Sequence, residues 1–151
     1  MKTLRHLAAV VFLVAFCASF SLADEPGKHP HYLHALSDLR DARAHLERIT
    51  GSERQNDEEV RAIDQIDKAI GEIKKASIDD GKDIHDHAPV DAHLGHKGRY
   101  HKALELNDRA HSDVAREEDD PRTRGLRDRA IHHIDEAHRI IDHLIINAAG
   151  D

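Results

Sequence analysis

Apolar residues recur three or four positions apart in several stretches of this chain, whereas no stretch alternates apolar and polar residues like a half-buried strand. A stripe with this spacing is typical of a helix that packs one face on other helices. Such stripes are formed by Ala35, Leu39, Ala42, Leu46 and Ile49, by Ile63, Ile66, Ile70 and Ile73, and by Ile131, Ile134, Ile141 and Ile145. The sequence therefore predicts an all-α fold.

The predicted helices fall into a doubled unit. When the sequence is shifted by 68 positions against itself, identical residues coincide along one register, from Tyr32 on Tyr100 to Ile73 on Ile141. Self-similarity of this kind indicates a duplicated supersecondary unit. The prediction is two repeated αα-hairpins, over about 29–78 and about 91–148, joined by a link over 79–90.

Breaks in the pattern separate the helices of each hairpin. Turn-forming residues at Gly51-Ser52 and Asn56-Asp57 divide the first pair, and Asp119-Asp120-Pro121 divides the second. Because short connections join antiparallel neighbours, four such helices predict an up-down-up-down four-helix bundle with a small core of Ala, Leu, Ile and Val. An elongated pair of hairpins that dimerises is the alternative, so monomer and homodimer both stay open.

The first 23 residues have the three parts of an export signal. Lys2 and Arg5 precede an apolar run over 7–20, and Ser21-Leu22-Ala23 places small residues at a cleavage site. A run of roughly 14 apolar residues is short for a membrane span, which needs about 20. We therefore expect a signal peptide over 1–23 and a mature single helical domain over 24–151. That domain would be periplasmic or secreted, without membrane insertion after cleavage.

Removal of that segment changes the chemistry available to the chain. All three Phe, the one Met and Cys17 lie within it, and the chain holds no Trp. The mature domain therefore forms no disulfide and offers no thiolate or thioether to soft Cu(I). Loss of Lys2 and Arg5 would make the formal charge of −7 two units more negative, so nucleic acid and anionic lipid are poor partners.

Histidine is the most over-represented residue, with 15 in the chain, and enrichment of this kind is a cue for metal binding. In the up-down-up-down arrangement, the starts of helices one and three, the ends of helices two and four, and the link all meet at one pole. Ten histidines are predicted there, namely His29, His31, His34, His85, His87, His93, His96, His101, His138 and His143. His6 lies in the predicted signal peptide, and the remaining four belong to the opposite half, namely His45, His111, His132 and His133.

Two local spacings suit chelation of one ion. His85-Asp86-His87 lies in the link, and His93-x-x-His96 places two imidazoles on one helical face. Neutral imidazole is a good ligand for Zn²⁺, Ni²⁺ and Cu²⁺. A metal site at the pole is therefore the leading prediction.

His138 falls between Ile134 and Ile141 on an apolar stripe, where a polar ring needs a partner. One interpretation is a core histidine bonded to a carbonyl or to Asp142, and the other is an inward ligand that shares a layer with His101 and Glu105. The predicted metal ligands are His85, His87, His93, His96, His101, His138, Glu105 and Asp142.

Other chemistries have weaker support. Asp108-x-x-His111 and Asp135-x-x-His138 resemble the Glu-x-x-His of di-iron bundles, but they use Asp, and companion glutamates are missing. The sequence has no Cys-x-x-Cys-His, no aromatic-rich core for haem and no Gly-rich phosphate loop. We therefore expect no haem, no nucleotide and no catalysis, with a di-iron or haem enzyme as the weakest hypothesis.

With its export segment, Cys-free mature part and abundant histidines, the chain resembles the small periplasmic metal-binding proteins of bacteria. That resemblance implies a four-helix bundle that binds several divalent ions, copper included. The pattern departs from the family, which spaces its histidines along the helices at regular heptads. The stretches over 32–40 and 73–83 also resemble an uncharacterised secreted bacterial family.

Two functional hypotheses follow. In the first, the mature chain binds or buffers a divalent transition metal (Cu²⁺, Zn²⁺ or Ni²⁺) without catalysis. In the second, it is a pH-responsive structural or interaction module of the bacterial envelope, since many imidazoles charge together in mild acid.

Overall fold

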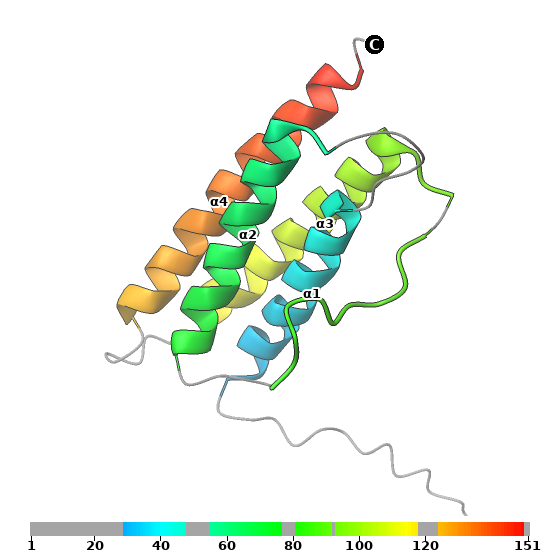
Figure 1. Cartoon of the computed structure of the whole chain (residues 1–151). Coiled ribbons are helices and arrows are strands. Elements are labelled where there is room, and N and C mark those ends of the chain that lie inside the picture. The colour runs from blue at the N-terminus through cyan, green and yellow to red at the C-terminus, as the bar shows by residue number, and fades with distance from the viewer. Residues whose placement is uncertain (1–28, 48–54, 77–80, 92, 118–123, 150–151) are drawn as a thin grey trace, which may run out of the picture.

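A computed structural model describes residues 29–47, 55–76, 81–91, 93–117 and 124–149 of the 151-residue chain. Within these ranges the protein is all-helical, with no strand, and forms a four-helix bundle as predicted (Figure 1). The helices are α1 (Pro30–Glu47), α2 (Asp57–Lys75), α3 (His96–Arg116) and α4 (Arg124–Asn147). The predicted signal peptide lies outside the described residues, and both it and the internal duplication stay predictions.

The helices form a four-membered ring in which each helix packs on two others. α1 contacts α2 and α3, and α4 contacts the same two helices. The α1–α3 contacts run antiparallel, because His31 at the start of α1 meets Asp113 near the end of α3, while Arg99 near the start of α3 reaches the carbonyl of His45 near the end of α1. α1 and α4 therefore run one way and α2 and α3 the other (Figure 1).

This order is up-down-down-up, so the predicted up-down-up-down order is wrong. The prediction placed the whole link between the hairpins at one pole, with the start of α3 beside the end of α2. The described part of the link instead runs along the bundle: the Lys82 carbonyl accepts from Lys74 of α2, and the Ala88 amide donates to Asp41 of α1. About 20 residues of chain span the roughly 27 Å length of an 18-residue helix with ease.

The predicted apolar stripes form the core. Ala35, Leu39, Ile66 and Ile141 are among its fully buried side chains, whereas Ile131 and Ile145 are only partly buried and pack against its edge. Two tyrosines, at 32 and 100, are buried with them. Packing of Ala, Leu and Ile therefore stabilises the bundle, as the sequence predicted.

A partly buried polar network joins the starts of α2 and α3 at one end of the bundle. Asn56 and Glu59 form a capping box at the start of α2, in which each side chain bonds the backbone N–H of the other residue at 2.8 Å. The Tyr100 hydroxyl of α3 donates to the second oxygen of Glu59 at 2.8 Å, and burial together with this bond raises the pKa of Tyr100. The network therefore fixes α3 against the start of α2.

We expect Tyr100→Phe to lower the free energy of unfolding by about 1–3 kcal/mol, because the buried Glu59 carboxylate loses a donor. Urea denaturation followed by circular dichroism measures the change. A double-mutant cycle with Glu59→Gln isolates the pair. Strictly additive effects in that cycle would show that the two side chains do not interact.

Candidate metal centre

The ten histidines of the predicted pole do not meet at one end of the folded chain. His29, His31 and His34 lie at the start of α1, while His96 at the start of α3 lies at the opposite end of the bundle. An 18-residue helix separates these ends by about 27 Å. The single-pole prediction is wrong because α3 enters the bundle from the other end.

The two link histidines of the predicted site have partners of their own. Nη1 of Arg43 donates to Nδ1 of His85 at 3.2 Å, and the same ring nitrogen lies 3.7 Å from a Glu47 carboxylate oxygen. Nδ1 of His87 bonds the carbonyl of Ala88 at 2.7 Å. A guanidinium is always a donor, so Nδ1 of His85 is occupied and only its Nε2 could bind an ion.

His93, His96, His101 and Glu105 are described residues, and they do not form a group of three ligand atoms within 4.8 Å of one another. His93 follows an Asp91 turn ahead of α3, the ring of His96 contacts Tyr100 of its own helix, and His101 is exposed. Glu105 bonds Lys102 at 2.9 Å and lies 3.4 Å from Arg109. The Lys102 bond, more than any other contact, lowers its pKa.

His138 is exposed, so both interpretations of it are wrong. Its Nδ1 lies 2.7 Å from an Asp108 oxygen of α3, not against a core carbonyl, Asp142, His101 or Glu105. α4 turns Ile134, Ala137 and Ile141 into the core, which leaves position 138 on the flank of the stripe. Asp142 lies elsewhere, on a groove between α2 and α4 that His143 and Glu58 also line.

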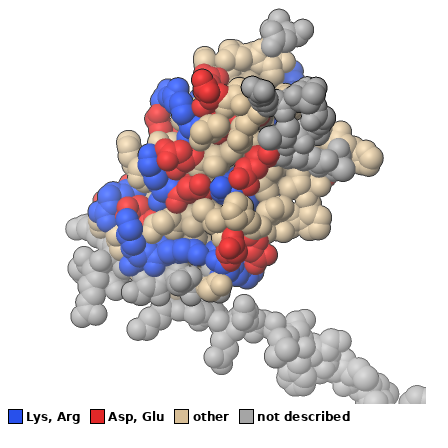
Figure 2. Space-filling model, in the orientation of Figure 1, with Lys and Arg blue, Asp and Glu red and all other residues tan. Residues whose placement is uncertain are grey.

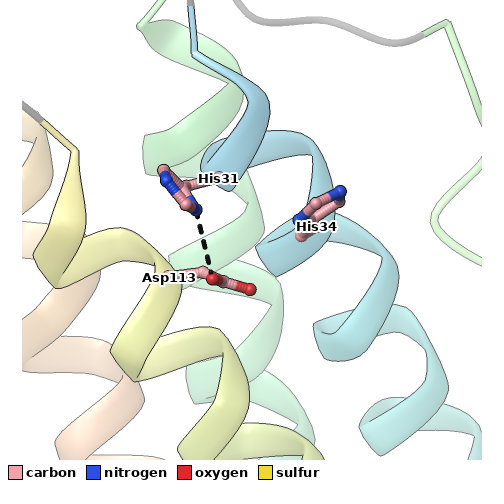
Figure 3. Close-up of side chains that lie close together, drawn as sticks. All are labelled: His31, His34 and Asp113. Atoms are coloured by element: carbon pink, nitrogen blue, oxygen red, sulfur yellow. Dashed lines mark hydrogen bonds and ion pairs between the residues drawn. The ribbon is translucent and has the colours of Figure 1, made fainter. Parts of the chain in front are cut away.

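Among the described residues, one group of three side chains brings possible metal ligands together: His31, His34 and Asp113, whose ligand atoms all lie within 4.8 Å of one another. His31 and His34 stand one turn apart on α1, and Asp113 reaches across from α3 (Figure 3). Nδ1 of His31 lies 3.3 Å from Oδ1 of Asp113, and the two imidazole rings are perpendicular, with centroids 6.3 Å apart. His31 and Asp113 are half-buried, and His34 is exposed.

Glu117 holds the first turn of α1 in place beside this cluster. Its side chain is only 5% exposed, and it accepts from the backbone N–H groups of His31 at 2.9 Å and Tyr32 at 3.3 Å. Its second oxygen bonds Nδ1 of His29 at 3.0 Å. The first N–H groups of a helix have no partner within the helix and carry partial positive charge, so a carboxylate is the natural cap. Glu117 therefore fixes the position of His31 relative to Asp113.

Two imidazoles and one carboxylate are a donor set that Zn²⁺, Ni²⁺ and Cu²⁺ accept, and three protein ligands leave further positions for water. A half-exposed location also allows the ion to exchange with solvent. Over the face shown in Figure 2, acidic and basic side chains are interspersed. The cluster can hold a cation through the local geometry of its three ligand atoms.

The sequence already contained part of this cluster. His31-x-x-His34 has the same spacing as His93-x-x-His96 and belongs to the predicted pole, but its two histidines are not among the predicted metal ligands. Asp113 was missed because the wrong helix order placed the end of α3 at the opposite pole. The helix order was therefore the missing information.

No family model, curated protein or solved structure matches this chain. The resemblance to small periplasmic metal-binding proteins therefore stays a prediction. None of the helices in the described part of the chain is both long and apolar enough to span a membrane.

We expect Glu117→Gln to reduce the free energy of unfolding by about 1–2 kcal/mol, because the cap of α1 and the partner of His29 lose their negative charge. Thermal and urea unfolding measure the loss. Glu136→Gln is the matched control, since Glu136 pairs with Arg139 on the helix surface and its loss should change stability by less than about 0.5 kcal/mol. Equal losses in the two variants would contradict a capping role.

His45 gives the bundle one source of pH dependence. Burial lowers its pKa, the positive charges of Lys102 and Arg99 and the neighbouring His87 add to this, and Asp41 opposes it. The folded chain thus binds this proton less readily than the unfolded chain. Its contribution to stability is complete above about pH 6.5 and is lost as the pH falls.

His45→Gln should therefore make the fall in unfolding free energy between about pH 7 and pH 5 shallower than in the wild type. Urea denaturation at a series of pH values gives the slope. His132→Gln, at an exposed position of α4, is the control for replacing a histidine. An unchanged slope in His45→Gln would show that another group causes the pH dependence.

Proposed function

We propose that this chain is a non-catalytic protein that binds or buffers a divalent transition-metal ion through His31, His34 and Asp113. The observation that carries the proposal is the approach of three ligand atoms to within 4.8 Å on two different helices. Glu117 supports it, because a capped first turn orients both imidazoles before an ion arrives. The ligand set differs from the eight residues predicted from the sequence.

The donor atoms favour Zn²⁺, Cu²⁺ or Ni²⁺ over hard ions, which prefer all-oxygen sites. Protons compete with the ion for imidazole nitrogen, so binding weakens as the solution becomes acidic. With a signal peptide over 1–23, the ion would be held outside the cytosol, in keeping with the periplasmic family that the sequence resembles.

Calorimetric titration of the purified chain with Zn²⁺, Ni²⁺ and Cu²⁺ tests the proposal. The double variant His31→Ala/His34→Ala and the single variant Asp113→Asn should each weaken one binding event by about tenfold or more. The control is His93→Ala/His96→Ala, which removes two imidazoles of identical spacing at the other end of the bundle and should leave that event unchanged.

Equal weakening in both double variants would indicate unspecific binding by exposed imidazoles and contradict the site. Unchanged binding in His31→Ala/His34→Ala would place the ion elsewhere. Circular dichroism of each variant shows that the helices remain folded.

A further inference from the structure

The interface between α3 and α4 contains a second, different arrangement of histidine and aspartate. Asp108 and His111 stand one turn apart on α3, and Asp135 and His138 stand one turn apart on α4. The pairs exchange partners across the interface: Nδ1 of His138 lies 2.7 Å from Oδ1 of Asp108, and Nε2 of His111 lies 3.4 Å from Oδ1 of Asp135. Each helix thus supplies a carboxylate to the imidazole of its antiparallel neighbour.

These four side chains line one groove, of about 330 Å³, whose remaining lining residues are Asn107 and Ile134. Asn107 is fully buried, and its Nδ2 donates to the Ile134 carbonyl at 3.0 Å. Its Oδ1 is also buried, and it accepts no hydrogen bond from any residue in the described ranges. A buried acceptor without a donor is costly, and this residue belongs to the lining of the groove.

The pairing leaves one nitrogen of each imidazole available. A carboxylate that binds one ring nitrogen orients the imidazole and makes the other nitrogen a better metal ligand, as is common around protein-bound metals. Here Nε2 of His138 and Nδ1 of His111 are the remaining nitrogens. Between 41% and 61% of each of the four side chains is exposed, so small side-chain rotations toward the groove cost little.

We infer that this groove is a second binding site for a divalent transition-metal ion, independent of His31, His34 and Asp113. His111 and His138 are its ligands, while Asp108 and Asp135 orient their rings. Water molecules complete the coordination. A mixed set of imidazole and water suits Zn²⁺, Co²⁺ or Ni²⁺.

The test uses the full chain with His31→Ala/His34→Ala as background, so that the first site is removed. Titration with Co²⁺, followed by visible absorption, and with Zn²⁺, followed by calorimetry, should show about one ion bound per chain. Addition of His111→Ala/His138→Ala should weaken this binding by about tenfold or more. Asp108→Asn/Asp135→Asn should weaken it by about 10–100-fold while both imidazoles remain.

The matched control in the same background is His101→Ala/His132→Ala, which removes one exposed imidazole from each of the same two helices and should leave binding unchanged. Absence of an ion in the background variant would overturn the second site and leave the first intact. So would Co²⁺ binding that is indifferent to His111 and His138. The opposite result is also possible. If the background variant still binds this ion, and His31→Ala/His34→Ala leaves the total binding of the wild type unchanged, the first site only is overturned.

Discussion

The structure depends on two buried charges, one on α3 and one directly after it, that cap the two ends of α1. Glu117 accepts the first backbone N–H groups of α1, and Nη1 of Arg99 donates to the His45 carbonyl in its last turn at 2.8 Å. Both signs complement the helix dipole, negative at the N-terminus and positive at the C-terminus. Arg99 and Glu117 lie 18 positions apart, and α1 itself has 18 residues, so the two charges reach the two ends of α1 only when α3 runs antiparallel to it.

This constraint determines where the chemistry of the bundle lies. Since α3 must begin beside the end of α1, the link has to travel the length of the bundle and carries His85 and His87 along α1. The same orientation brings the last turns of α3 to the first turn of α1, which is how Asp113 comes to face His31. The candidate centre therefore lies at the first turn of α1, whose backbone Glu117 already holds in place.

The helices could be predicted from the sequence, but the orientation of the second hairpin could not. A stripe such as Ile63, Ile66, Ile70 and Ile73 depends on local spacing alone, whereas the direction of α3 depends on Arg99 and Glu117, which look like surface charges in a sequence with 51 charged residues of both signs. The candidate site could be predicted only in part, because it too depends on the direction of α3. His31 and His34 could be chosen from spacing, but Asp113 could be found only once the direction of α3 was known.

The position of His138 shows why the groove between α3 and α4 could not be predicted from the sequence either. A helix in a four-membered ring touches two neighbours, so α4 buries Ile134, Ala137 and Ile141 and leaves the next position on the rim facing α3. An imidazole on such a rim meets a carboxylate of the antiparallel neighbour, as His138 meets Asp108 and His143 meets Glu58 at 2.7 Å. Each such pair belongs to one interface between two helices. A chain rich in histidine and acidic residues can therefore hold ions at separate interfaces, each fixed by its own helix pair, without gathering its imidazoles at one end.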